Sequence, residues 1–120
     1  MRILVVDDYA PFCNSVRLML RDHQVEVALD GREAIARLAD DPAFDVLLLD
    51  LNMPGLSGLE VYDHLQRGAP VPGTRVIFMT GGATTSLAAE RLGAIDAPSL
   101  EKPFREPELR ALLAGKAGTR

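Results

Sequence analysis

Five polar residues of this 120-residue sequence lie at or just after apolar segments and carry groups that bind cations or phosphoryl oxygens. They are Asp7, Asp8, Asp50, Thr80 and Lys102. Two carboxylates about 4 Å apart repel by roughly 4 kcal/mol at an effective dielectric constant near 20, so three together require protonation or a bound cation. Carboxylates with a loop carbonyl form a hard oxygen donor set, which suits Mg²⁺, with Mn²⁺ as a substitute.

The same residue types indicate phosphoryl transfer rather than general acid–base catalysis. An ionised Asp50 facing a divalent cation, a hydroxyl and an ammonium group is equipped to attack phosphorus and become an acyl phosphate. The cation and Lys102 would neutralise phosphoryl oxygens, and Thr80 would donate a hydrogen bond to one of them.

These side chains meet only if the apolar segments are parallel strands of one sheet, because the carboxyl ends of parallel strands share an edge. The segments cover residues 2–6, 25–29, 45–49, 75–79 and, more weakly, 97–100. The first, third and fourth are continuously apolar, as expected when helices cover both faces of a sheet. The second alternates apolar and polar residues, and the fifth contains Pro98, so both are predicted at the edges.

Helix signals separate the predicted strands. Pro11 suits the start of the first helix, and capping patterns precede the next two. These patterns pair Asp30 with Glu33 and Ser57 with Glu60. A weaker helix is predicted over about 85–92, ended by Gly93. The last helix is expected from about Pro107 to a stop at Gly115, with three leucines inward, namely Leu109, Leu112 and Leu113.

Alternating strands and helices with short loops predict a three-layer α/β/α sandwich around a doubly wound, five-stranded parallel sheet of order 2-1-3-4-5. In such sheets ligands bind beyond the carboxyl ends of the strands, where the order reverses, which here lies between the first and third strands. We expect one domain over 1–115 and a frayed tail over 116–120.

Composition narrows the possible partners and location. The net charge is −4 and basic residues are scattered, which argues against nucleic acid or an anionic membrane as the main partner. No apolar run approaches the about 20 residues that span a bilayer, and the short, acidic-ended N-terminal run does not fit a signal peptide. We expect a soluble, cytoplasmic protein. The single cysteine, Cys13, is expected to be buried, and His23 and His64 to face solvent.

Four motifs give the sequence a family resemblance. In order along the chain they read VVDD (5–8), LLLDLNMPGLSG (47–58), MTGG (79–82) and EKPF (101–104). In this order and at this spacing they resemble the receiver domain of two-component response regulators, whose sheet is flavodoxin-like. MTGG with the late EKPF is similar to receivers at the C-terminal ends of hybrid histidine kinases. The chain would be either a stand-alone receiver or a piece of a larger protein.

The resemblance implies a role for each acid of the site. Asp50 would accept a phosphoryl group from the phosphohistidine of a histidine kinase or histidine phosphotransfer protein, and this would switch contacts with a downstream partner. Asp7, Asp8 and Asp50 would hold Mg²⁺, with Asp8 coordinating directly and Asp7 partly through water. The backbone carbonyl of Asn52 would be a further ligand.

The resemblance also implies that Thr80 and Lys102 bind the phosphoryl oxygens, with a cis peptide before Pro103 aiming the lysine. The family usually carries an aromatic residue three positions before the Lys-Pro pair, but here that residue is Ser99. This chain therefore has no ring at that position to make the family's usual switching movement.

Two other classes of protein remain open from the residues alone. A phosphatase with an aspartyl nucleophile typically needs a second acid two residues beyond the nucleophile, where this chain has Asn52. An interaction module that is never phosphorylated would be favoured by loss of an acid or of Lys102, and all are present. The preferred interpretation is a phosphoacceptor without enzymatic turnover of its own.

Overall fold

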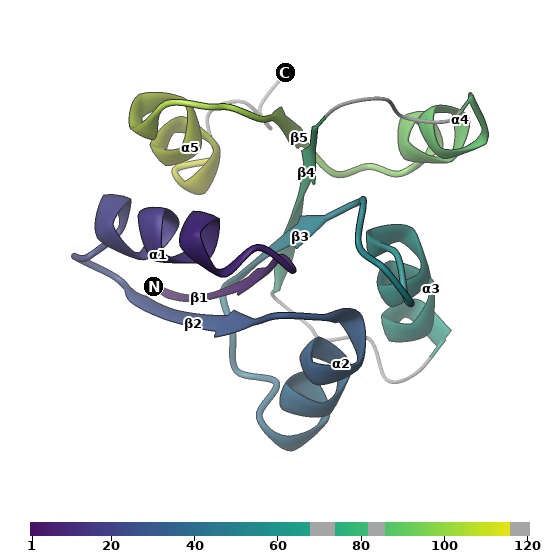
Figure 1. Cartoon of the computed structure of the whole chain (residues 1–120), viewed down its shortest axis with the longest axis horizontal. Coiled ribbons are helices and arrows are strands. Elements are labelled where there is room, and N and C mark those ends of the chain that lie inside the picture. The colour runs from purple at the N-terminus through teal and green to yellow at the C-terminus, as the bar shows by residue number, and fades with distance from the viewer. Residues whose placement is uncertain (68–73, 82–85, 116–120) are drawn as a thin grey trace.

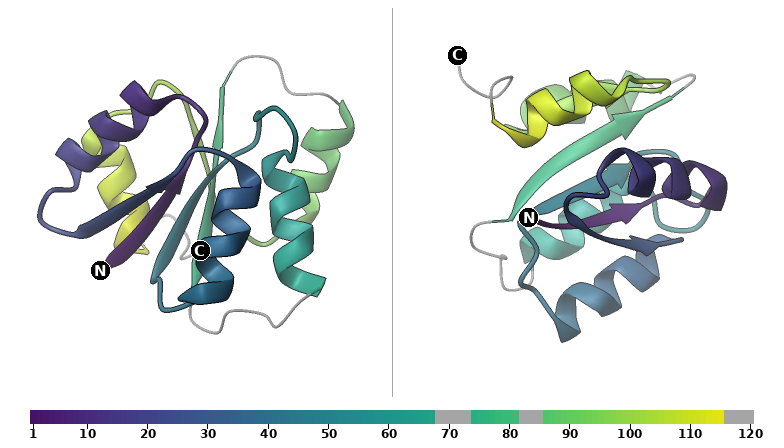
Figure 2. Two further views of the ribbon diagram at one scale, coloured as in Figure 1. Left: turned by 60° about the horizontal axis from the view of Figure 1, so that its bottom comes forward. Right: turned by 90° about the vertical axis from the view of Figure 1, so that its left-hand side faces the viewer.

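The structure of the chain, a computed structural model, describes residues 1–67, 74–81 and 86–115. Five parallel strands form one sheet of order β2-β1-β3-β4-β5. Their bounds are β1 Arg2–Val6, β2 Gln24–Ala28, β3 Val46–Asp50, β4 Arg75–Thr80 and β5 Ser99–Glu101. Figure 2 shows the strands side by side and the twist of the sheet. The predicted sheet order is confirmed.

Helices cover both faces of the sheet (Figure 1). Their bounds are α1 Ala10–Met19, α2 Gly31–Asp40, α3 Gly58–Arg67, α4 Ser86–Ala94 and α5 Glu106–Leu113. Helices α1 and α5 lie on one face, and α2, α3 and α4 lie on the other. Successive strand residues point to opposite faces, so the apolar runs of β1, β3 and β4 supply both cores. This explains why those strands have no polar alternation.

The two edge strands are those predicted from the polar residues of β2 and from Pro98 before β5. Three residues of β2 are only half-buried, and β5 is three residues long. Pairing of β5 begins later than the predicted residue 97, since Pro98 has no amide hydrogen to donate, although its carbonyl accepts from Phe78. In β3 and β4 the strands extend one residue further than predicted. Asp50 and Thr80 are therefore the last residues of their strands.

The capping prediction holds in full at the start of α3 and in part at the start of α2. Ser57 and Glu60 form a reciprocal box, in which Ser57 Oγ accepts from the Glu60 amide at 3.2 Å and Glu60 Oε1 accepts from the Ser57 amide at 2.9 Å. Asp30 Oδ1 accepts from the Glu33 amide at 2.7 Å, but the Glu33 carboxylate accepts from Leu29 instead of closing the box.

The end predicted for α4 is wrong. The helix passes through Gly93 to Ala94, and Gly93 does not adopt the left-handed conformation that ends many helices. Gly115, with a φ of +79°, does adopt it after α5. None of residues 86–94, all of which the structure describes, is buried, and Leu87 is 69% exposed. Helix α4 is therefore held on the sheet more loosely than its neighbours.

Some predictions fall outside the described residues. These are the tail over 116–120, the second glycine of MTGG and the first residue of the predicted fourth helix. Within the described residues, no helix combines the length and the apolar character required to cross a membrane.

Candidate functional site

The three predicted acids meet at the carboxyl edge of the sheet. Asp7 and Asp8 follow β1, and Asp50 closes β3, the neighbouring strand. Each offers a carboxylate oxygen, and these three oxygens lie within 4.8 Å of one another. Asp7 is 1% exposed and Asp50 is 3% exposed, whereas Asp8 faces solvent. Two of the charges are thus withdrawn from water, and the third lies where an ion would enter.

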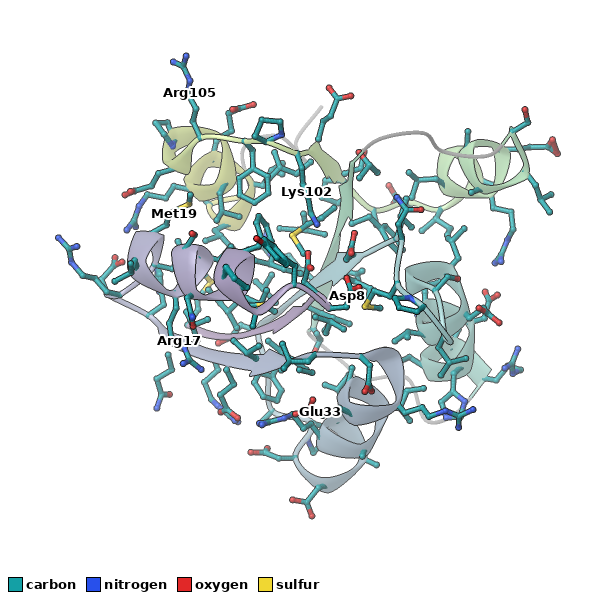
Figure 3. All side chains as sticks on the ribbon, viewed as in Figure 1. Asp8, Arg17, Met19, Glu33, Lys102 and Arg105 are labelled. Carbon is teal, nitrogen blue, oxygen red and sulfur yellow. The ribbon has the colours of Figure 1, made fainter. Side chains whose placement is uncertain are left out.

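Lys102 reaches into this cluster from the segment after β5. Figure 3 labels Lys102 and Asp8. Its Nζ lies 2.5 Å from Asp7 Oδ2 and 3.4 Å from Asp50 Oδ1. The peptide between Lys102 and Pro103 is cis, as predicted. The sequence predicted that the lysine would face a phosphoryl group, but it did not reveal that Asp7 holds the ammonium. One ammonium among three carboxylates leaves the site with a net negative charge.

Burial and the neighbouring charges both shift the pKa values of Asp50 and Lys102. Burial, followed by the charge of Asp7, raises the pKa of Asp50, while Lys102 and the Asn52 amide lower it less. Burial lowers the pKa of Lys102, but its hydrogen bonds and the charges of Asp7 and Asp50 outweigh that effect, so this pKa is raised overall. Lys102 therefore stays protonated, and ionised Asp50 is favoured by any further positive charge.

The backbone fixes the two buried acids. Asp7 Oδ1 accepts a hydrogen bond of 2.9 Å from the Tyr9 amide, and Asp50 Oδ1 accepts a longer one of 3.4 Å from the Asn52 amide. Gly58 packs directly against the end of β3: a Cβ built there would lie 2.3 Å from the Asp50 carbonyl oxygen. Any larger residue at position 58 would displace the backbone at Asp50 and Leu51.

The loops after β3 and β4 are joined beside the acids. Thr80 is half-buried at the end of β4, and its carbonyl accepts from the Lys102 amide at 2.6 Å. The side chain of Asn52 donates a 3.0 Å hydrogen bond to the carbonyl of Gly81. The sequence singled out only the backbone carbonyl of Asn52, so this side-chain contact was missed. Ser99 is exposed at the start of β5.

An aromatic residue near the site was also missed. Lys102 Nζ lies 4.4 Å from the centre of the Phe12 ring, and this ring packs edge to face with Phe104. In the sequence, Phe12 is one apolar position of an amphipathic helix, and nothing marks it as different. Only the position of Lys102, ninety residues later, gives it a charged neighbour.

The cysteine and one histidine behave as predicted, and the other histidine does not. Cys13 is buried, and burial, aided by the charge of Asp7, raises the pKa of its thiol to about 11. His64 is exposed as predicted. His23 is not a freely solvated side chain: its Nδ1 lies 3.1 Å from the N-terminal amine of Met1, and its side chain is only 20% exposed.

The donor set fits a small, hard divalent cation. Oxygen ligands lie about 2.0–2.1 Å from Mg²⁺, so two of them on opposite sides of one ion are about 4.2 Å apart. The carboxylate oxygens of Asp7, Asp8 and Asp50 meet this requirement with little movement. The buried charges also supply the reason to bind an ion, since Lys102 alone leaves them under-neutralised.

Curated relatives share the sequence over most of this chain. The response regulator MprA of Mycolicibacterium vanbaalenii is 40% identical over 116 residues, which cover 92% of this chain and 47% of MprA. A protein-glutamate methylesterase/protein-glutamine glutaminase of Rhizobium johnstonii is 39% identical over 116 residues, which cover 86% of this chain and 32% of that enzyme. The chain thus spans about a third to about a half of the length of these relatives.

A solved structure shares the whole architecture. Chemotaxis protein CheY4 of Vibrio cholerae superimposes with a TM-score of 0.81 at 30% identity, and the match covers 95% of this chain and 96% of CheY4. The profile of the response regulator receiver domain matches residues 3–114, which include every site residue described above. With its 2-1-3-4-5 sheet, this chain belongs to the receiver domain family of two-component response regulators.

Proposed function

We propose that Asp50 is the phosphoacceptor of this receiver domain, and that the domain takes a phosphoryl group from a phosphohistidine in the cytoplasm. The observation that supports this most directly is the placement of Asp50: a 3% exposed carboxylate lies in one cluster with two further acids, and Lys102 Nζ is 3.4 Å from its Oδ1. For stability alone, a neutral residue would serve better than an acid in this position.

The proposed reaction moves one phosphoryl group between two residues. An Oδ atom of Asp50 attacks phosphorus, the P–N bond to the donor imidazole breaks, and its electron pair returns to that imidazole. Lys102 exchanges Asp7 for a phosphoryl oxygen, and the Thr80 hydroxyl donates to another oxygen. Water later hydrolyses the acyl phosphate to inorganic phosphate and restores the Asp50 carboxylate.

Mg²⁺, with Mn²⁺ as a substitute, is the proposed cofactor. Asp7, Asp8, Asp50 and the backbone carbonyl of Asn52 are its proposed ligands, in agreement with the hard oxygen donors at the site. When bound, the ion would neutralise charge on the phosphoryl oxygens. The residues of the chain then hold the acceptor, the ammonium and the hydroxyl around a position for phosphorus.

The proposed partners are a histidine kinase or a histidine phosphotransfer protein as donor, and a downstream protein that responds to phosphorylation. The resemblance to receivers of hybrid histidine kinases stays a prediction. One relative carries the name of an enzyme, but its match to this chain covers 32% of that enzyme. We propose that the chain itself catalyses only its own phosphorylation and dephosphorylation.

A labelling experiment tests the proposal. The protein is incubated with Mg²⁺ and acetyl phosphate or phosphoramidate, and its intact mass is measured. We expect a gain of one phosphoryl group that is slowly lost, and none in Asp50→Asn. Asp40→Asn is the matched control, since the Asp40 side chain is exposed and makes no hydrogen bond or ion pair with the described residues. Borohydride reduction of the acyl phosphate would identify the labelled residue.

The outcomes separate the three classes of protein considered above. A stoichiometric label supports the phosphoacceptor. Continuous consumption of the phosphodonor would indicate a phosphatase-like enzyme, and an absence of label and turnover would indicate an interaction module. Full labelling of Asp50→Asn would show that a different residue accepts the phosphoryl group.

A further inference from the structure

Phe12 lies near the start of α1, beside the lysine of the site. It is the third residue of α1 and is half-buried, and the centre of its ring is 4.4 Å from Lys102 Nζ. Phe104, which is 8% exposed, packs against it with ring centres 5.7 Å apart and an angle of 86° between the rings. The orientation of the Phe12 ring is thus fixed by a residue two positions after the lysine that it contacts.

Lys102 has three close partners, and two of them are needed elsewhere during the reaction. Asp7, at 2.5 Å, is a proposed ligand of the divalent cation, and Asp50, at 3.4 Å, loses its carboxylate charge when it is phosphorylated. The face of an aromatic ring attracts a cation within about 6 Å of its centre, and this attraction strengthens when water is excluded. The Lys102 side chain is 23% exposed. Of the three partners, the Phe12 ring is the one that neither binds the cation nor changes its charge during the proposed reaction.

We propose that Phe12 is a positioning residue for phosphoryl transfer, whose ring holds the Lys102 ammonium beside Asp50 once a divalent cation has taken the carboxylates that otherwise bind it. This inference rests on the roles proposed above for Asp50 and Lys102. Without the cation, Asp7 holds the lysine whether or not the ring is present. With the cation bound, the ring keeps the ammonium from turning toward solvent. The effect of Phe12 on the position of Lys102 should therefore depend on the cation. A purely structural role would have the same effect with or without the cation.

The first test follows the lysine in the parent protein. The chain contains two lysines, Lys102 and Lys116, so ¹³C-lysine labelling gives one signal from the site and one reference. Protons over a ring face resonate upfield. We expect the ε-methylene signal of Lys102 to lie upfield of that of Lys116, and to remain there when Mg²⁺ is added. Movement of the signal to the Lys116 position on addition of Mg²⁺ would overturn the proposal.

The second test compares rates of labelling by phosphoramidate at saturating Mg²⁺. Phe12→Leu keeps apolar bulk but removes the ring, and we expect labelling to slow by roughly 3- to 10-fold. Phe12→Tyr keeps the ring and is expected to restore most of the rate. The matched control is Phe44→Leu, which removes a second ring under a cation, since the Arg2 guanidinium lies 4.2 Å from the Phe44 ring at the opposite edge of the sheet. Thermal melting checks that each variant is folded.

These results also separate this inference from the proposed function. If the parent is labelled on Asp50 and Phe12→Leu is labelled at the same rate, the role of Phe12 is refuted and the phosphoacceptor stands. If the parent is not labelled, the phosphoacceptor proposal fails, while the lysine signals still report whether the ring retains the ammonium when Mg²⁺ binds.

Discussion

The side-chain amide of Asn52 donates a hydrogen bond of 3.0 Å to the backbone carbonyl of Gly81. Asn52 is two residues beyond the proposed phosphoacceptor, and Gly81 follows Thr80 on the way to α4. The bond therefore joins the loop that phosphorylation would alter to the segment leading to the most loosely held helix. We expect a change at Asp50 to reach α4 through this contact, without an aromatic ring at position 99.

Asn52→Ala is expected to reduce the response of α4 to beryllofluoride, which mimics the acyl phosphate. Hydrogen exchange is measured with and without beryllofluoride, and in the parent we expect altered protection over residues 86–94. In Asn52→Ala, loss of a hydrogen bond with a net contribution of about 1 kcal/mol should make that change smaller. Asn14→Ala, at an exposed position of α1, is the control. An undiminished α4 response in Asn52→Ala would rule out this route.

The ion pair between Arg91 and Asp63 is expected to hold α4 against α3. Arg91 Nη2 lies 2.6 Å from Asp63 Oδ1, and the hydrogen bond from Arg91 lowers the pKa of Asp63. Both side chains are partly exposed, so the contribution to stability should be small and should weaken with salt. Arg91→Met is expected to speed amide exchange over 86–94 at low salt, and Glu90→Gln is the control on the same helix. Equal exchange in parent and Arg91→Met at low salt would contradict this role.

Divalent cations are expected to stabilise the fold without any phosphodonor. Mg²⁺ relieves the repulsion among the three acids, and a ligand that binds only the folded state raises the melting temperature. Asp8→Ala should remove most of this rise, because Asp8 supplies the exposed ligand. Asp40→Ala, which alters an exposed acid elsewhere, should retain it. If Mg²⁺ raises the melting temperature equally in parent and Asp8→Ala, the ion binds elsewhere.

Asp50→Asn is expected to stabilise the protein when EDTA removes divalent cations. Burial and the charge of Asp7 raise the pKa of Asp50, so the fold favours the protonated acid. The stability this provides is fully present below the unfolded pKa of about 4, and is lost as pH rises through the higher folded pKa. Because of this linkage, the melting temperature of the parent should fall relative to that of Asp50→Asn as the pH rises from about 4 to about 7. A constant difference across this range would show that Asp50 does not titrate as inferred.

The sheet order followed from the sequence because burial leaves a clear pattern. Continuous apolar runs place β1, β3 and β4 at the centre, while the polar residues of β2 and Pro98 before β5 indicate edges. Strand ends were less certain, because hydrogen bonding continues past the apolar residues: the Leu51 amide still donates to the Met79 carbonyl at 3.0 Å. The end of α4 was misplaced because a glycine stops a helix only when it adopts the left-handed conformation.

The gathering of the acids and Lys102 could be predicted because parallel strands bring their carboxyl ends to one edge. Pairings within the site could not, since they depend on side-chain rotamers and loop paths. The bond from Lys102 to Asp7, the ring of Phe12 over the ammonium and the amide of Asn52 on Gly81 are all of this kind. Each joins residues far apart in the sequence, and local patterns contain no information about them.

The contact between Asp7 and Lys102 spans 95 residues, so we expect the complete site to form late in folding. Contacts between distant residues require closure of a long loop, so they tend to form after local structure and neighbouring strands are in place. A chain in which β1, β3 and β4 have paired but β5 has not would expose three acids without their lysine. Such a chain would lack the ammonium that we propose binds the phosphoryl group. We therefore expect molecules with an incomplete sheet to be poor phosphoacceptors.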